Sequence, residues 1–331
     1  MQRITLAGRL IITLVVVAAV YFGFRYFVGT RPAPAVVTAT STAPGAAVDT
    51  ATSSAPSPSG SSAAAFAYEA PAPVNGKLKG VVELGASGFN SFIVRIDKAR
   101  NWKLEKADFG NSLVLENMAS DEDVRKGLKA YIGQMLDYGV GGRDIHFVVS
   151  SGAQKAAGTA KIIKALKSLN YVVNTVTPEK EGVLGLRSVL PPSYASKAFV
   201  TDIGSGNTKI SWLAGGAPTS VETYGAKYFE KGTDDATVAS EVKAQAEQVP
   251  ASLRQTCFII GGVPFEMAKK VRNGKERFTV LKAADTYQLD NAKSKAGLNI
   301  YKAIADATGC QQFVFDWDAN FTIGYLLTLP Q

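Results

Sequence analysis

Residues 198–216 read AFVTDIGSGNTKISWLAGG, two apolar and β-branched runs joined by a short polar stretch with two glycines. Such a pattern is typical of a β-hairpin. Asp202 stands near the end of the first run and is followed by Ile203 and Gly204. Residues 80–97, GVVELGASGFNSFIVRID, repeat the order, with an acidic residue, a leucine and a glycine before the small-residue loop. The repetition predicts two related lobes that each open with a hairpin.

Strands and helices alternate after each hairpin. Residues 120–140 predict a helix in which Ser120 is the N-cap, Asp123 completes a capping box and Gly139 marks the end. The following residues predict a βαβ unit, with a strand at 144–151, a helix at 156–171 and a strand at 171–177. The second half predicts further elements at 235–249, 256–271, 292–308 and 311–317.

The first 76 residues differ in composition from the rest. Residues 4–28 are almost wholly apolar, with Arg9 and Arg25 near the ends, and are long enough for a transmembrane helix. Residues 29–76 are rich in Ala, Pro, Ser and Thr, which predicts a disordered linker. The expected organisation is an anchor at 1–28, a linker at 29–76, a first lobe at 77–198 and a second lobe at 199–331.

A cleaved signal peptide is the competing interpretation of residues 4–28. The apolar stretch, however, continues through residues 21–27, and no small-residue cleavage site follows it at once. We therefore expect a single-pass protein of a bacterial inner membrane. Because Arg3 and Arg25 lie on opposite sides of the apolar stretch, the charge pattern leaves open which side carries the head.

The chain has 331 residues and a formal net charge of +8 at pH 7. This charge favours anionic partners, although solubility alone accounts for it equally well. Nucleic acid ranks below small phosphate ligands because no run of Lys or Arg is interleaved with aromatic residues. Cys257 and Cys310 form no CxxC pair and are expected to be free thiols, and His146 is the only histidine, so we expect no zinc site.

The loop of the second hairpin is a candidate phosphate site. Small residues leave backbone N–H groups open to an anion, and Ser205, Asn207 and Thr208 add side-chain donors to those of Gly204 and Gly206. Asp202, at the strand end, is a candidate ligand for a divalent cation. An ordinary Gly-Asn hairpin turn explains the same residues without a ligand.

The first hairpin offers similar chemistry, with Gly85, Ser87 and Asn90 as candidate phosphate-binding residues and Glu83 as a candidate metal ligand. Later in the chain, a strand runs into Gly261-Gly262 and then a helix. A helix start at this point is placed to approach a nucleotide. Packing of the strand on the helix accounts for the two glycines as well.

Several segments, taken in order, resemble the exopolyphosphatase and guanosine pentaphosphate phosphatase family of the actin-like superfamily, which also holds sugar kinases, Hsp70 and actin. The resemblance covers roughly residues 80–327 and implies an α/β, two-lobed actin-like ATPase (ribonuclease H-like) fold behind the transmembrane helix. The segments that carry it are ELGAS and FNSFIV, DIHFVVSSGAQKAAG, TPEKEGVLGLRSV, FVTDIGSGNTKISWL, FIIGGVPFEMA and ANFTIGYLL.

The resemblance implies hydrolysis of a terminal phosphate from polyphosphate or a phosphorylated guanosine nucleotide, with a divalent metal such as Mg²⁺. Glu181, in EKEGVLGL, falls where the family places the glutamate that activates water. A carboxylate base suits phosphoryl transfer, in which positioning and charge neutralisation account for most of the catalysis. Taken by residue chemistry alone, Glu181 is a solvated charge in a loop.

Three positions depart from the family pattern. Glu83 replaces an aspartate, and Lys209 stands where the family has a glutamate next to the metal. Gln154 replaces an arginine and removes a bidentate phosphate clamp.

These departures leave three hypotheses open: a membrane-tethered phosphatase, a catalytically inactive phosphate-binding or scaffold module, and a nucleotide-dependent assembly protein of the actin kind. The sequence is compatible with a homodimer and does not fix the oligomeric state.

Overall fold

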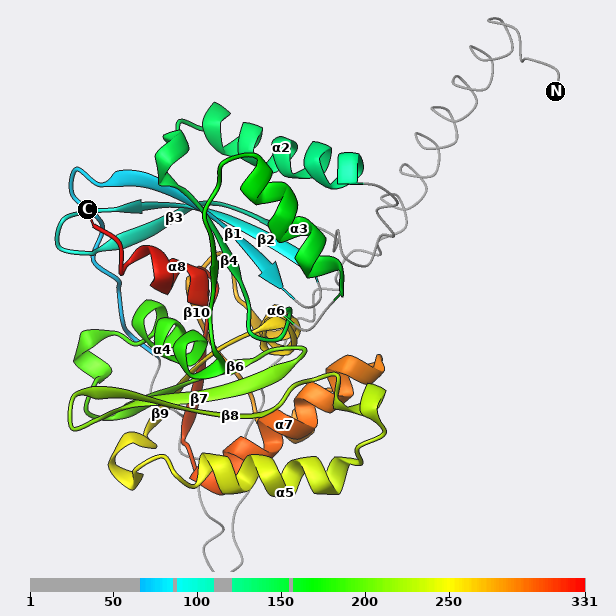
Figure 1. Cartoon of the computed structure of the whole chain (residues 1–331). Coiled ribbons are helices and arrows are strands. Elements are labelled where there is room, and N and C mark those ends of the chain that lie inside the picture. Colours follow the sequence, from blue (N-terminus) through cyan, green and yellow to red (C-terminus); the bar gives the residue numbers. More distant parts are fainter. Residues whose placement is uncertain (1–65, 86–87, 110–120, 155–156, 331) are drawn as a thin grey trace, which may run out of the picture. The chain divides into compact units, whose positions relative to one another are not determined.

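The computed structural model describes residues 66–85, 88–109, 121–154 and 157–330 (Figure 1). The expected anchor, most of the linker, Ser87 and the Ser120 cap lie outside the described residues. Within the described ranges, no helix is both long and apolar enough to cross a membrane. The described residues belong to one compact unit, Ser61–Gln331, which is built around two β-sheets.

The first sheet has five strands in the order β3-β2-β1-β4-β5. Its strands are β1 (Lys77–Gly85), β2 (Gly88–Ile96), β3 (Trp102–Phe109), β4 (Ile145–Val149) and β5 (Val173–Thr175). Strands β1, β2 and β3 pair antiparallel, whereas β4 and β5 continue the sheet in parallel with β1. The predicted first hairpin and the βαβ unit are therefore confirmed.

The second sheet has six strands in the order β10-β11-β9-β6-β7-β8. Strands β6, β7 and β8 pair antiparallel, and β9 and β11 extend the sheet in parallel with β6. This order repeats that of the first sheet, with β10 added antiparallel at the edge. The strands are β6 (Ala198–Ile203), β7 (Asn207–Ala214), β8 (Ala217–Tyr224), β9 (Thr256–Ile260), β10 (Phe278–Val280) and β11 (Gln312–Asp316).

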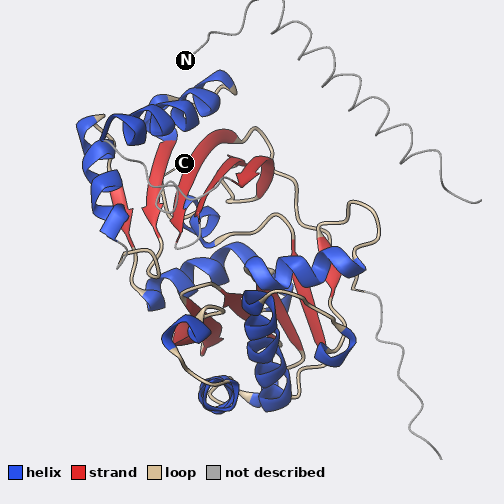
Figure 2. Ribbon diagram, turned by 90° about the vertical axis from the view of Figure 1, so that its right-hand side faces the viewer, coloured by secondary structure: helices blue, strands red, loops and turns tan. Residues whose placement is uncertain are grey.

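Helices cover the outer face of each sheet (Figures 1 and 2). On the first sheet, α2 (Asp121–Asp137) and α3 (Ala157–Ser168) bury apolar side chains against β1, β2 and β4. On the second sheet, α5 (Asp235–Ala246), α6 (Gly262–Val271) and α7 (Ala292–Thr308) do the same. Because side chains alternate along a strand, Val82 and Leu84 of β1 pack under α2 and α3 while Val81 faces the interior between the sheets.

Two inner helices lie between the sheets. Leu184 of α4 (Pro178–Val189) packs with α8 (Phe321–Leu326) on the inner face of the first sheet, whereas Leu186 and Val189 pack on the second. The helices approach closely at Gly324, where an added Cβ would lie 1.9 Å from the carbonyl oxygen of Leu184. Although its sequence position placed α8 in the second lobe, the helix thus packs against the first sheet.

Five short 3₁₀ helices complete the fold over the described residues. They are η1 (Gly142–Asp144), η2 (Pro192–Tyr194), η3 (Tyr228–Lys231), η4 (Ala251–Leu253) and η5 (Ala284–Thr286).

Residues 66–76 correct the predicted boundary of the linker. Phe66 packs on Phe258, with ring centroids 5.6 Å apart, and on Phe278 at 5.3 Å. At the other end, the backbone N–H of Val74 donates to Asp97 at 3.0 Å. Composition averaged over a Pro- and Ala-rich stretch hid an aromatic side chain that packs, partly buried, against the second sheet. The head therefore includes at least ten residues that were assigned to the linker.

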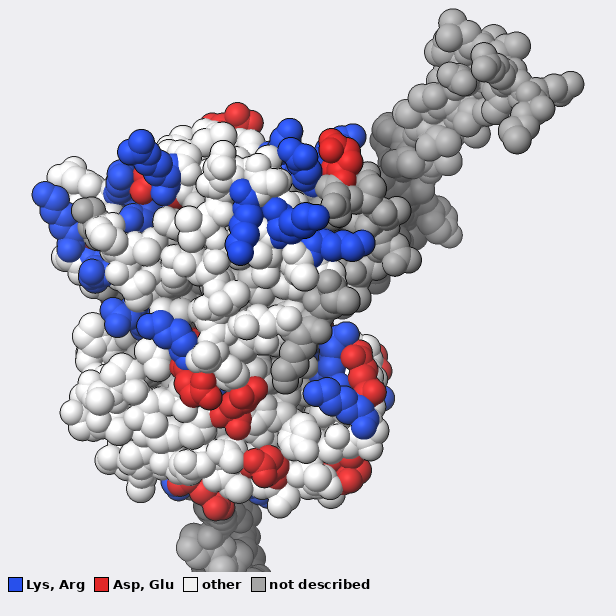
Figure 3. All heavy atoms as spheres, in the orientation of Figure 1, with Lys and Arg blue, Asp and Glu red and all other residues white. Residues whose placement is uncertain are grey.

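The positive charge of the chain is prominent on the surface of α3 (Figure 3). Lys161, Lys164 and Lys167 are exposed on this helix, and Lys and Arg side chains gather over this part of the face in view.

Candidate functional site

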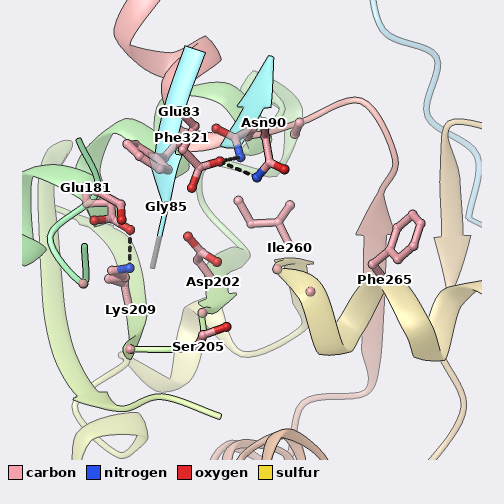
Figure 4. A pocket seen from close by; sticks show the side chains of 18 of the residues that line it. Glu83, Gly85, Asn90, Glu181, Asp202, Ser205, Lys209, Ile260, Phe265 and Phe321 are labelled. Atoms are coloured by element: carbon pink, nitrogen blue, oxygen red, sulfur yellow. Dashed lines mark hydrogen bonds and ion pairs between the residues drawn. The ribbon is translucent and has the colours of Figure 1, made fainter. Parts of the chain in front are cut away.

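A cleft of about 410 Å³ contains most of the predicted site residues (Figure 4). Its walls come from both sheets, from the start of α4 and from the segment that leads into α8. The predicted residues that line it are Glu83, Gly85, Asn90, Glu181, Asp202, Gly204, Ser205, Gly206, Asn207, Gly261 and Gly262. Residues far apart in the sequence are thus brought to one place.

Thr208 does not line the cleft. It lies in β7 between Asn207 and Lys209, and strand alternation turns its side chain to the opposite face, where it is fully buried. The side chain of Gln154 also points elsewhere, because its amide donates to the carbonyl oxygen of Val176 at 2.6 Å.

Glu181 is buried in a helix, which contradicts its interpretation as a solvated charge in a loop. Pro178 begins α4, and the Thr177 side chain caps it by accepting from the backbone N–H of Lys180. This start places Glu181 in the first helical turn with 3% of its surface exposed. Its Oε2 accepts from the backbone N–H of Ser151 at 2.7 Å, and its Oε1 accepts from Lys209.

The ion pair between Lys209 and Glu181 is almost completely buried, with side-chain exposures of 3% and 4%. Burial by itself would lower the pKa of the Lys209 ammonium, but the carboxylates of Asp202 and Glu181 outweigh burial and raise it. Lys209 therefore stays protonated at neutral pH. The sequence analysis did not predict the pair of Lys209 and Glu181. It placed Lys209 in the second hairpin, where this residue lies opposite Asp202.

Glu83 occupies in the first hairpin the place that Asp202 has in the second. Its Oε2 accepts from Asn90, directly opposite in the register, at 2.9 Å, and from Asn320 at 3.0 Å. Burial raises the pKa of Glu83 to about 7; the bond from Asn90 lowers it, and repulsion by Glu181 adds to the rise. Asn320, which also caps α8, was missed because its partner lies 237 positions away.

Asp202 lies at the end of β6 and is partly exposed to the cleft. Burial raises the pKa of its carboxyl group, an effect that the ammonium of Lys209 partly offsets. The loop after it approaches the first lobe, since a Cβ added to Gly206 would lie 3.2 Å from Cα of Gly152. This loop is held by the side-chain amide of Asn207, which donates to Ser151 Oγ at 2.9 Å.

Gly261 marks the turn from β9 into α6. Its φ of +111° is a conformation that favours glycine, and a Cβ there would lie 2.3 Å from the carbonyl oxygen of Ile203. The glycine thus lets β9 and α6 pack closely against β6. Packing requires Gly261 whether or not a ligand is bound.

An aromatic wall forms one side of the cleft. Phe109, Phe265, Phe315 and Trp317 line it, and the rings of Phe265 and Trp317 lie 5.2 Å apart between centroids. Lys293, at the start of α7, lines the same cleft, and burial lowers its pKa. Sequence reasoning did not single out this wall, because aromatic residues beside a strand are usually part of the core.

The donor set around Glu83 and Asp202 does not fit the predicted Mg²⁺ ion. A hard divalent cation requires several oxygen ligands, but Glu181 is engaged at both oxygens and Glu83 Oε2 accepts two amide bonds. At an effective dielectric constant of about 20, an ammonium roughly 4 Å from a divalent cation repels it by about 8 kcal/mol. Among the residues that the structure describes, no group of three or more His, Cys, Asp or Glu side chains is placed to hold a metal ion.

Solved structures share this fold. The Ppx/GppA family member from Aquifex aeolicus matches with a TM-score of 0.58 and 17% identity, covering 76% of this chain and 97% of that chain. An exopolyphosphatase from Cytophaga hutchinsonii matches with a TM-score of 0.60 and 12% identity, covering 76% and 97%. A third structure, of an exopolyphosphatase-like protein, has a TM-score of 0.56 at 12% identity and covers 77% and 98%.

These matches confirm at the level of the fold the resemblance to Ppx/GppA proteins that the sequence indicated. No protein-family model and no curated protein matches the sequence. At identities this low, similarity establishes the fold, and the activity has to be argued from the site.

Proposed function

We propose that this chain binds a phosphorylated ligand in the cleft between its two sheets and acts as a binding module, without hydrolysis by Glu181. The observation that carries the proposal is the state of Glu181, whose two carboxylate oxygens accept from Lys209 and from the backbone of Ser151. A general base needs an oxygen within hydrogen-bonding reach of the attacking water. With both oxygens engaged and the group buried, Glu181 is poorly suited to that role.

The ligand class follows from the two sides of the cleft. Gly204, Ser205 and Gly206 form a small-residue turn that lines the cleft, and their small side chains leave room there for a phosphate group. The aromatic wall of Phe109, Phe265, Phe315 and Trp317 gives the same cleft an apolar side, on which a planar ring is able to stack. A nucleotide has phosphate groups for the turn and a base for the aromatic wall, whereas polyphosphate has no ring to place on that wall. The proposed ligand is therefore a nucleotide.

Membrane attachment through residues 4–28 belongs to the same proposal. An apolar anchor followed by a linker would keep the nucleotide-binding head near a membrane surface. The expected outcome is that the full chain stays with the membrane fraction after a high-salt wash, whereas a chain that begins at residue 61 is released. Release of the full chain by salt alone would exclude the anchor.

Binding is tested by isothermal titration of the full chain in detergent with GTP, ATP and inorganic tripolyphosphate. We expect the nucleotides to bind more tightly than tripolyphosphate. Substitution Lys293→Ala removes a cation from the cleft and should weaken nucleotide binding by about tenfold. Lys295→Ala is the matched control, because Lys295 lies on the same helix and is exposed. Equal losses in both variants, or no binding by any of the three ligands, would contradict the proposal.

Hydrolysis of a terminal phosphate is the second candidate, and the position of Glu181 in the cleft beside Asp202 and the Gly204 turn favours it. In that case the purified chain releases phosphate from polyphosphate or guanosine pentaphosphate, and Glu181→Gln abolishes the release. A folded chain that binds nucleotide and releases no phosphate supports the binding module instead.

A further inference from the structure

We propose that the ammonium group of Lys209 serves as a built-in cation in the cleft, in the place of a bound divalent metal, so that ligand binding here needs no metal ion. The inference rests on the proposed function, because it concerns how a phosphorylated ligand binds at the same site. According to this inference, Lys209 is the residue that makes ligand binding in the cleft independent of a metal ion.

The first argument is the charge of the lining. Six charged residues of the described chain line the cleft, four of them acidic. A phosphate group would be repelled by such a lining unless positive charge lay close to it. The acidic residues are Glu83, Glu181, Asp202 and Asp316, and the basic ones are Lys209 and Lys293.

The second argument is the position of the ammonium. Lys209 Nζ is paired with the carboxylate of Glu181, and Lys209 lies directly opposite Asp202 in the hairpin register, so its charge lies at the base of the cleft. It also lies beside the Gly204 turn, because Nζ is 3.8 Å from the point that a Cβ on Gly204 would occupy. A fixed cation beside this turn supplies the positive charge that a bound metal ion would otherwise supply to a phosphate group.

The third argument is that the cation is fixed. The Lys209 side chain is 97% buried, and its bond to Glu181 holds it against α4. Asp316, the fourth acidic residue of the lining, is neutralised separately by two bonds from Arg277, each of 2.9 Å. The positive charge at the base of the cleft therefore belongs to the protein and does not depend on an ion from solution.

The test is titration of the full chain with GTP in EDTA and again in excess Mg²⁺. We expect the two dissociation constants to agree within about threefold. A direct measurement accompanies it: the free Mn²⁺ signal in electron paramagnetic resonance should not fall when the ligand-free chain is added. Binding of GTP only in Mg²⁺, or loss of free Mn²⁺ signal, overturns the inference and leaves nucleotide binding standing.

Variants separate a role in binding from a role in stability. The double variant Lys209→Gln with Glu181→Gln removes both charges and keeps a hydrogen-bonding pair, so the head should fold. In EDTA its affinity for GTP should fall by at least about tenfold. The matched control is Lys302→Gln with Asp306→Asn, an exposed ion pair on α7, which should bind as the unaltered chain does. Unchanged affinity in the Lys209 and Glu181 double variant overturns the inference.

A gain of function provides an independent check. Lys209→Glu removes the ammonium, frees Glu181 Oε1 and places a carboxylate opposite Asp202, which together supply oxygen ligands for a divalent cation. Mn²⁺ should raise the thermal unfolding temperature of this variant and leave that of the unaltered chain unchanged. Equal shifts in the two proteins contradict the inference. Absence of GTP binding under every condition would instead remove the proposed function, and the inference with it.

Discussion

The two hairpins at the cleft have equivalent places in their sheets, but the acidic residue of each has a different partner on the opposite strand. In the first, Glu83 of β1 lies opposite Asn90 of β2. In the second, Asp202 of β6 lies opposite Lys209 of β7. Both acidic residues reach the same cleft. The residue across the hairpin is an amide in one lobe and an ammonium in the other.

This difference decides the charge that each lobe presents. Burial raises the pKa of Glu83 to about 7 and the neutral amide donors only partly offset it, so this carboxyl titrates near neutral pH. The ammonium of Lys209 stays charged and forms an ion pair with Glu181. A duplicated fold thus holds one group that changes charge at neutral pH and one ion pair that does not.

The largest effect is expected when the charged partner in the second lobe is removed. Lys209→Met keeps the apolar stem and deletes the ammonium, which leaves Glu181 buried without its counter-ion. Loss of one partner of a buried pair destabilises proteins by about 3–5 kcal/mol. Urea unfolding of the variant measures the loss.

Replacing both partners provides the control for this loss. Lys209→Met with Glu181→Leu should recover most of the stability, because no uncompensated charge remains. If the single and double variants are equally unstable, the loss of stability comes from packing and not from the unpaired charge of Glu181. That result would contradict the inferred difference in charge between the two lobes.

A second, smaller effect is expected in the first lobe and depends on pH. Because the folded protein binds the Glu83 proton more tightly than the unfolded chain, stability falls as pH rises from 4.5 to about 7 and is level above that range. Glu83→Gln removes this titration and keeps an oxygen that accepts from Asn90 and Asn320. The variant should match the unaltered chain at acidic pH and exceed it by up to about 3 kcal/mol above neutral pH.

Thermal or urea unfolding across this pH range measures the difference between the two proteins. A constant difference at every pH would show that Glu83 does not titrate near 7.

The smallest effect is expected at Asn90, the neutral partner. Asn90→Ala removes one hydrogen bond to Glu83 and should cost about 1 kcal/mol, since Asn320 still donates. Because this bond favours the ionised carboxylate, the pKa of Glu83 should rise further above 7. Titration of the Glu83 carboxyl followed by NMR would report the shift, and a fall in that pKa would contradict the assignment of Asn90.

Much of the fold was predictable because its signals are local. The repeated order of acidic residue, apolar residue and glycine between two β runs predicted both hairpins, and the βαβ unit followed from residues 144–177. Helix α4 was not predicted. Its signals, Thr177 as cap and Pro178 in the first turn, were read as a charged loop around Glu181. The aromatic residues that hold 66–76 to the head were lost in an average over linker composition.

For the site, the sequence by itself indicated residues that line the cleft: Glu83 and Asp202 before the hairpin loops, the glycines, and, through the family resemblance, Glu181. Only the tertiary structure decided their partners, because α4 and α8 pack between the sheets and carry Glu181 to Lys209 and Asn320 to Glu83. Burial and partner set whether a carboxyl group is free, paired or protonated. Neither is encoded in the neighbouring residues, and both arise when distant segments close around the cleft.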